Sequence, residues 1–196
     1  SYIIGKIHHM DIRQYGSGNA GTTNALRTLG KKAGAMTLIG DMLKCVIAIL
    51  IVDAVFKNRY QEILPLLGMY TAAGCVLGHN FPFYLHFKGG KGIAVSAAVI
   101  VVSNLHPVFI GVGLAVFILV VAVTRYVSLG SLIVVWYIPI FTLLYYRESD
   151  LFPVILIVSL LFTILAYIKH KANIIRLIHG TENKFGEKKE KKSEEN

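Results

Sequence analysis

The chain has 196 residues, of which 55% are hydrophobic and only 16% are charged, and its mean hydropathy is +0.60. So few charged side chains exclude an ordinary soluble domain and favour one integral membrane unit. The formal net charge is +9, but the basic residues flank apolar segments without an aromatic-basic stripe. Membrane topology therefore explains this charge better than nucleic-acid binding does.

Apolar segments follow one another along the chain. Residues 1–7 are apolar but shorter than the ~20 residues that cross a bilayer, so we expect them to be the end of a trimmed first span. Further apolar runs cover residues 33–56, 63–78, 93–104, 107–124, 128–146 and 151–168. The stretch from Asn104 to Pro107 breaks the 93–104 run from its successor, because proline lacks an amide hydrogen and disfavours helical geometry in the residue before it. The sequence predicts an all-α integral membrane protein with seven transmembrane helices.

The basic residues are distributed unequally between the two sides of this topology. Alternate threading places residues 6–32, residues 79–91, Arg125 and the tail from residue 169 on one side, and sixteen of the 20 Lys and Arg residues lie there. The positive-inside rule makes this side cytoplasmic. We expect residues 1–186 to form a single membrane domain and residues 187–196 to form a charged, disordered cytoplasmic tail.

Two charged residues, Asp41 and Lys44, stand one helical turn apart inside a predicted span. A mutual ion pair facing the helix bundle is the simplest interpretation, and a role in a site is the alternative. The other aspartates are scattered, and their spacing predicts no metal site.

The first glycine-rich loop covers residues 15–24. Glycine allows backbone N–H groups to turn toward one point and form an anion-binding nest, and a helix beginning near Thr22 would add its N-terminal donors and carry Arg27 in its second turn. Simple capping or turn formation by Ser17 and Asn19 is the alternative. The density of polar groups beside a cation favours phosphate binding.

The second loop contains Gly78-His-Asn-Phe-Pro82 and Phe87-Lys-Gly-Gly-Lys-Gly92. Lys91 is the better phosphate ligand because glycines surround it, whereas Lys88 could instead extend to lipid headgroups. A lone histidine such as His79 is more often structural. Neither Gly30-Lys31 nor Gly90-Lys91 has the preceding glycine that a Walker A motif requires. No strand precedes Gly16-x-Gly18-x-x-Gly21 as a dinucleotide site requires.

A third cluster, formed by His170, Asn173, Arg176 and Glu182, follows the last span. His170 and Asn173 are one turn apart on a continuing helix, so their side chains can converge toward the loops. A basic helix resting on anionic lipid is the alternative. The short connection Arg125-Tyr-Val-Ser128 lies on the same predicted side.

These motifs, in this order and between these spans, resemble the bacterial acyl-phosphate:glycerol-3-phosphate acyltransferase family. The resemblance implies transfer of a fatty acyl group from acyl phosphate to the sn-1 hydroxyl of glycerol 3-phosphate, which gives lysophosphatidic acid and phosphate at the cytoplasmic face of the bacterial inner membrane. It implies these two substrates and membrane lipids as partners and no cofactor, and it leaves the oligomeric state open. A transporter or channel for phosphate or an organophosphate is the alternative, although such sites usually lie near the bilayer midplane.

We expect the active site to be built from the interhelical loops at this face. Arg27, Lys91 and the backbone of residues 17–19 would hold the phosphates and stabilise charge at the carbonyl. His170 is the candidate base, and a phosphate oxygen of the substrate is the alternative proton acceptor. The predicted catalytic residues are Ser17, Arg27, Lys91, His170 and Asn173. The predicted substrate-binding residues are Gly18, Asn19, Thr23, Asn24, His79, Lys88, Gly89, Gly90, Ser128 and Glu182.

Overall fold

The structure, a computed structural model, describes residues 1–102 and 107–187, and within that range it is helical without any strand. The predicted break at Asn104 and all but the first residue of the predicted disordered tail lie outside the described residues. The helices are α1 (Tyr2–Ile7), α2 (Thr22–Leu29), α3 (Lys31–Phe56), α4 (Leu64–Asn80), α5 (Ile93–Val102), α6 (Pro107–Thr124), α7 (Val127–Val134), α8 (Tyr137–Tyr145), α9 (Phe152–Lys169) and α10 (Lys171–Ile178).

Three segments of the described chain are long and apolar enough to cross a bilayer: Lys31–Phe56, Val127–Tyr145 and Phe152–Lys169. At 1.5 Å per residue the 26 residues of α3 extend about 39 Å, more than the ~30 Å hydrocarbon core. The apolar segment Val108–Thr124 is slightly shorter, and α4 has 17 residues. The predicted helical membrane fold is present, and the count of seven spans stays a prediction.

The span predicted over residues 128–146 is interrupted in the middle, between α7 and α8. Pro139 has no amide hydrogen to donate to the carbonyl of Val135, four residues earlier. The hydroxyl of Thr163 on α9 donates to this freed carbonyl oxygen at 3.4 Å. A neighbouring helix thus satisfies the backbone group that proline leaves unpaired, as a membrane interior requires.

The core lies where α3, α4, α5, α8 and α9 meet, and it includes the buried residues Cys45, Ala72, Val95 and Ile155. The outer helix faces are also apolar. More than half of the surface of Ile47, Leu119 and Leu161 is exposed, on α3, α6 and α9 respectively. Apolar surface on both sides of the helices is expected where lipid replaces water around the bundle.

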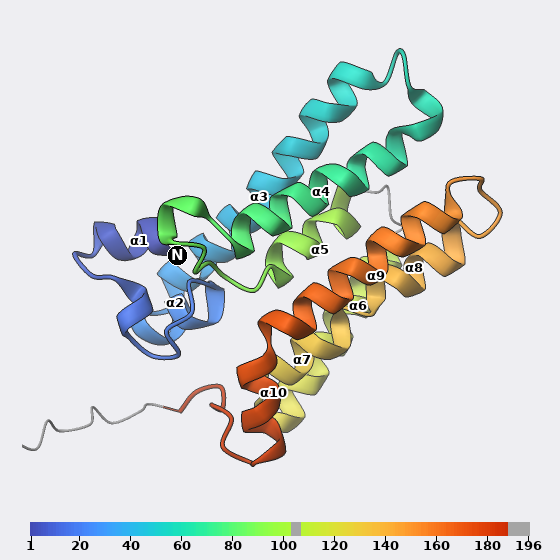
Figure 1. The fold of residues 1–196 in the computed structure, drawn as a ribbon. Coiled ribbons are helices and arrows are strands. Elements are labelled where there is room, and N and C mark those ends of the chain that lie inside the picture. Colours follow the sequence, from blue (N-terminus) through green and yellow to red (C-terminus); the bar gives the residue numbers. More distant parts are fainter. Residues whose placement is uncertain (103–106, 188–196) are drawn as a thin grey trace, which may run out of the picture.

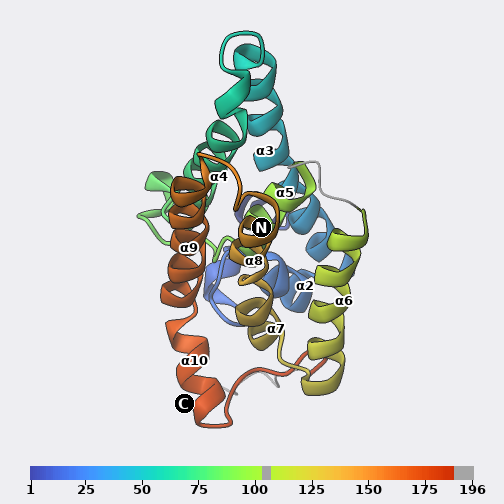
Figure 2. The same ribbon diagram turned by 90° about the vertical axis from the view of Figure 1, so that its right-hand side faces the viewer.

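The basic loops gather at one end of the molecule. Figure 1 shows α1, α2, the loop before α5 and α10 at this end, and the α3–α4 and α8–α9 connections at the opposite end. In the view at right angles in Figure 2, the α3–α4 connection lies at the top and α10 at the bottom. Helix α2 folds back on α3 with little space, because a Cβ at Gly34 would lie 2.7 Å from the Leu26 Cβ. The fold therefore brings both glycine-rich loops and the segment after the last long helix together.

Candidate active site

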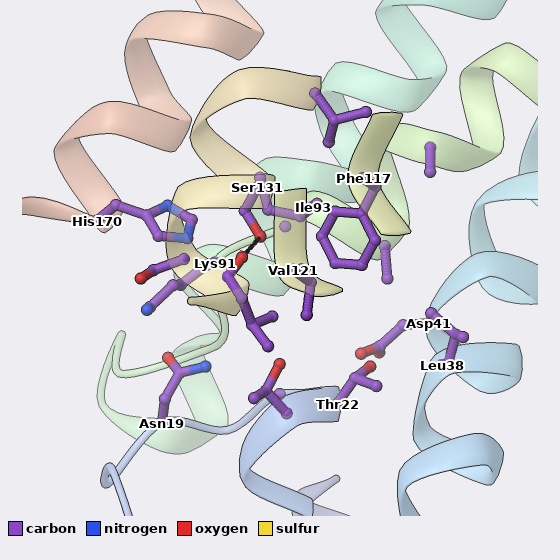
Figure 3. Close-up of a pocket in the computed structure, with 18 of the residues that line it drawn as sticks. Asn19, Thr22, Leu38, Asp41, Lys91, Ile93, Phe117, Val121, Ser131 and His170 are labelled. Atoms are coloured by element: carbon purple, nitrogen blue, oxygen red, sulfur yellow. Dashed lines mark hydrogen bonds between the residues drawn. The ribbon is translucent and has the colours of Figure 1, made fainter. Parts of the chain in front are cut away.

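A cavity of about 600 Å³ opens among the basic loops and continues between the helices. Its polar end is lined by α2, the loop before α5 and α10, and its apolar part by residues of α5, α6, α7 and the start of α8. Figure 3 shows Lys91 and His170 on one side, Asn19 and Thr22 facing them, and Phe117 on the adjoining apolar wall. The cavity thus joins a polar mouth to an apolar channel.

Most of the sequence-predicted site residues line this one cavity. The structure brings together Ser17, Asn19, Thr23, Asn24, Arg27, His79, Lys91, Ser128, His170, Asn173 and Glu182. It does not place Gly18, Lys88, Gly89 or Gly90 on the cavity wall. The roles assigned to these residues stay predictions.

Lys91 begins a chain of polar contacts that ties the second loop to the segment after α10. Its Nζ donates to Oδ1 of Asn173, and Nδ2 of Asn173 donates to Oε1 of Glu182 at 2.8 Å. The other carboxylate oxygen accepts from Nε of Arg176, also at 2.8 Å. Burial lowers the pKa of Lys91 to about 8, while the Glu182 charge opposes that shift.

Arg27 is the other cation of the cavity, and it makes no hydrogen bond or ion pair with another residue of the described chain. Burial lowers its pKa, with the negative charge of Glu182 acting in the opposite direction. The hydroxyls of Thr22 and Ser128 also line the cavity, and both are buried without a hydrogen-bond partner among the described residues. Buried polar groups in proteins are nearly always satisfied, so these three side chains are suited to a polar ligand.

His170 is 2% exposed and sits between α9 and α10. Its Nδ1 lies 2.8 Å from the carbonyl oxygen of Ala166. A carbonyl oxygen can only accept, so Nδ1 carries the hydrogen and Nε2 of the neutral ring keeps a lone pair. Burial, followed by the positive charge of Lys91, lowers the pKa of His170 to about 4. The ring is therefore neutral at physiological pH.

Asn24 organises the first loop from within. The side chain is 1% exposed, its Nδ2 donates to the carbonyl oxygens of Ile12 and Tyr15, and its Oδ1 accepts from the Ser17 amide at 2.9 Å. The Gly18 amide donates to the Tyr15 carbonyl oxygen. These internal bonds differ from the expected anion nest, because they occupy two of the amides that the nest would use. Gly18, at φ +70°, allows the turn itself.

The glycines of the second loop serve close packing. The amides of Gly89 and Gly90 donate to the carbonyl oxygens of Asn80 and His79 at the end of α4. A Cβ at Gly90 would collide with the His79 ring and lie 2.7 Å from the Ala20 carbonyl oxygen. These two amides are therefore also occupied, and Lys88 is exposed outside the cavity. The second loop contributes Lys91 to the cavity and uses the glycines to position it.

The predicted pair of Asp41 and Lys44 is confirmed, with 2.8 Å between Lys44 Nζ and Asp41 Oδ1. The same ammonium group lies 2.6 Å from Nδ1 of His79. Both Asp41 and His79 line the cavity. The contact ties α3 to the end of α4, immediately before the residues that carry the second loop.

Sequence reasoning missed several residues that line the cavity. Ser131 lies three residues after Ser128 on α7, and that helical spacing was the available signal. The apolar wall, which includes Phe117 of α6 and Tyr137 of α8, gave no signal because every span is apolar. Within the described range no group of three or more His, Cys, Asp or Glu side chains could hold a metal ion.

Comparisons with known proteins agree with the resemblance seen in the sequence. The family model described as glycerol-3-phosphate acyltransferase matches residues 1–180. A protein of that name from Clostridioides difficile is 50% identical over 97% of this chain and 90% of its own length. A protein of the same name from Trichlorobacter lovleyi is 42% identical over 93% of this chain and 88% of its own length.

The fold is similar to a solved membrane enzyme. The crystal structure of PlsY (YgiH), an integral membrane glycerol 3-phosphate acyltransferase, in its glycerol 3-phosphate form matches with a TM-score of 0.79 and 33% sequence identity. The match covers 94% of this chain and 86% of that one. The family model and the structural match each cover most of the chain. The chain therefore belongs to the glycerol-3-phosphate acyltransferase family of integral membrane proteins.

Proposed function

We propose that this chain transfers a fatty acyl group from acyl phosphate to the sn-1 hydroxyl of glycerol 3-phosphate, giving lysophosphatidic acid and inorganic phosphate. The observation that carries the proposal is a single cavity with two cations, Arg27 and Lys91, at its polar end and an apolar channel behind them. Acyl phosphate has a phosphate and a long apolar chain, and glycerol 3-phosphate adds a second phosphate. The cavity offers complementary groups to both reactants.

The relatives support the choice of acceptor and product. The solved relative is known in a glycerol 3-phosphate form and in a lysophosphatidic acid form, and the second matches this chain with a TM-score of 0.76. The donor is inferred from the resemblance of the sequence motifs, and cations near the bond that breaks would suit a phosphate leaving group. Lys91 and Arg27 are suited to this task since both reach the cavity.

In the proposed reaction the glycerol hydroxyl oxygen attacks the acyl carbonyl carbon, and the bond from that carbon to the phosphate oxygen breaks. The hydroxyl proton passes to the departing phosphate. Neutral His170 can accept a hydrogen bond from the hydroxyl through Nε2 and so orient it. A pKa of about 4 makes this imidazole a weak base, which favours the phosphate as the proton acceptor. Positioning and charge stabilisation then carry most of the rate enhancement.

We place this reaction at the cytoplasmic face of the bacterial inner membrane. The basic loops gather at one end of the bundle (Figure 1), and sixteen of the 20 Lys and Arg residues belong to the segments assigned to that side. Positively charged segments are retained on the cytoplasmic side during membrane insertion. Water-soluble glycerol 3-phosphate and membrane-dissolved acyl phosphate would then meet at the same surface.

The test is an assay of the purified chain with palmitoyl phosphate and glycerol 3-phosphate, following lysophosphatidic acid and inorganic phosphate together. Palmitoyl-CoA and palmitoyl acyl carrier protein serve as alternative donors. We expect palmitoyl phosphate to be the only one of the three donors that reacts, and to give lysophosphatidic acid and inorganic phosphate in equal amounts. Activity with the thioesters only would refute the donor assignment, and uptake of phosphate by vesicles without lysophospholipid would favour the transporter.

Matched substitutions connect the activity to the cavity. Lys91→Ala and Arg27→Ala should each lower kcat/KM by about a hundredfold or more, the usual effect of removing one charge-stabilising donor. Lys57→Ala is the control, because Lys57 is exposed at the opposite end of the bundle. Activity retained in both cavity variants would contradict the proposed site.

A further inference from the structure

One aromatic side chain separates two apolar cavities in the helix bundle. The channel of the active-site cavity is lined by Gly113 of α6 and Tyr137 of α8. A second, open pocket of about 450 Å³ is lined by Val108, Phe109, Val112, Tyr137 and Tyr145, and its residues Val108, Val112 and Tyr145 are also exposed on the outer face of the bundle. Tyr137 is common to both linings, so its ring is the wall between them.

Contacts with α6 hold this wall in place. The Tyr137 hydroxyl donates to the carbonyl oxygen of Phe109 at 2.7 Å, and the two rings pack with their centroids 4.2 Å apart. One turn further along the same helix α6, the ring lies against Gly113, where an added Cβ would be 3.0 Å from Tyr137 Cε1. Glycine at this position therefore leaves just enough room for the ring, and the hydrogen bond fixes its direction.

The position of the wall sets the length of the channel. Ser128 at the polar end and Tyr137 are nine residues apart along α7 and α8, which corresponds to roughly 13 Å of helix rise. One leaflet of a bilayer is about 15 Å thick, half of the hydrocarbon core. The channel is therefore slightly shorter than one leaflet is thick.

We propose that Tyr137 is the specificity-determining residue that limits the length of the acyl chain this enzyme accepts. The inference rests on the proposed acyl transfer. A chain that fills the channel ends against the Tyr137 ring, and a longer one must either displace the ring or leave methylene groups outside. Removing the ring would join the two cavities and extend the channel toward the opposite end of the bundle.

The experiment compares lauroyl, palmitoyl, stearoyl and arachidoyl phosphate as donors for purified wild-type and variant chains. In Tyr137→Ala we expect kcat/KM for the longest donor, relative to palmitoyl phosphate, to rise at least tenfold, because the end of the longer chain no longer has to displace the ring or bend out of the channel. Ala97→Phe places a ring partway along the channel wall and should shift the preference toward lauroyl phosphate. The KM for glycerol 3-phosphate should change little in either variant, since both sites lie in the apolar part.

Two controls separate the wall from a general effect on folding. Tyr137→Phe keeps the ring and loses only the hydroxyl, so it should keep the wild-type length profile. Tyr70→Ala removes a tyrosine from α4 that is half exposed and lines neither cavity, and it should also keep that profile. If Tyr137→Ala does not fold, Tyr137→Leu replaces it and should show a smaller shift in the same direction.

The assay distinguishes an error in the role of Tyr137 from an error in the proposed acyl transfer. A wild-type chain that transfers no acyl group from any acyl phosphate would remove the reaction itself. An active wild-type chain whose length profile is unchanged in Tyr137→Ala or Tyr137→Leu would overturn the role of Tyr137 alone.

Discussion

Replacing Glu182 with glutamine would test whether a buried carboxylate keeps Lys91 charged at neutral pH. The Glu182 side chain is 5% exposed. One of its oxygens accepts a hydrogen bond from Asn173, whose own carbonyl oxygen accepts one from Lys91. A single amide group therefore separates the carboxylate from the ammonium group. The substitution keeps the size of the side chain and one hydrogen-bond acceptor but removes the negative charge.

The size of the effect follows from Coulomb's law. At roughly 7 Å and an effective dielectric constant of about 20, two unit charges interact by about 2 kcal/mol, or roughly thirtyfold in a protonation equilibrium. Burial lowers the pKa of Lys91 to about 8, and Glu182 opposes that shift. Loss of the carboxylate therefore lowers the pKa of Lys91 further, and the ammonium group loses its proton closer to neutral pH.

The assay is the rate of phosphate release from palmitoyl phosphate between about pH 6 and about pH 9, the range in which such a group controls a rate profile. The charged form of Lys91 is lost as the pH rises through its pKa, so wild-type activity should fall on the alkaline side. In Glu182→Gln the fall should begin at lower pH. Glu148→Gln is the control, because Glu148 is 89% exposed at the opposite end. The same alkaline limb in Glu182→Gln and the wild type would refute the reasoning.

Other substitutions address the loops and the buried histidine. Asn24→Ala removes three hydrogen bonds within the first loop and should lower the free energy of unfolding by about 2–4 kcal/mol. A thermal midpoint equal to that of Asn58→Ala, at the opposite end, would contradict this. Gly90→Ala forces a methyl group against a histidine ring and a carbonyl oxygen and should cost about 1–3 kcal/mol. Gly74 has open space around it, so Gly74→Ala should leave the free energy of unfolding unchanged. Equal thermal midpoints in Gly90→Ala and Gly74→Ala would count against the packing role of Gly90. Burial holds the pKa of His170 at about 4, below its ordinary 6.5, so between these values the unfolded chain binds more protons and stability should fall as pH falls. His170→Asn should make that dependence less steep without abolishing it, because burial also lowers the pKa of His79 to about 4. Thermal unfolding measures the slope, and an equally steep fall would argue against the role of His170.

The arrangement of spans could be largely predicted from the sequence because hydropathy acts locally. A run of apolar residues such as 151–168 needs no knowledge of its neighbours to be assigned to the membrane, and α9 covers Phe152–Lys169. The interruption between α7 and α8 was missed, although Pro139 was visible. Proline in a membrane helix is tolerated only where a neighbour satisfies the freed carbonyl, and here that neighbour is Thr163 of another helix.

The sequence predicted that Arg27 and Lys91 would lie together, and both line the cavity, whereas the expected free backbone amides are partly occupied; the roles of these groups stay predictions. Charged residues beside glycine are rare next to apolar spans, so Arg27 and Lys91 stood out. Whether a loop amide faces a ligand depends on which acceptor is nearer. In the first loop the nearer acceptor of Ser17 is the Asn24 side chain, and in the second loop the carbonyl of His79 takes the Gly90 amide. Local sequence does not contain these distances.

The sequence alone determined that the chain is helical, lies in a membrane, and carries its positive charge in loops on one predicted side, because composition and hydropathy are properties of short segments. Only the tertiary structure decided that Lys91 meets Asn173, 82 residues later, and that Tyr137 lines both the active-site cavity and a second pocket. Contacts between distant residues depend on how the helices pack against one another. That packing is set by the shapes of many side chains together.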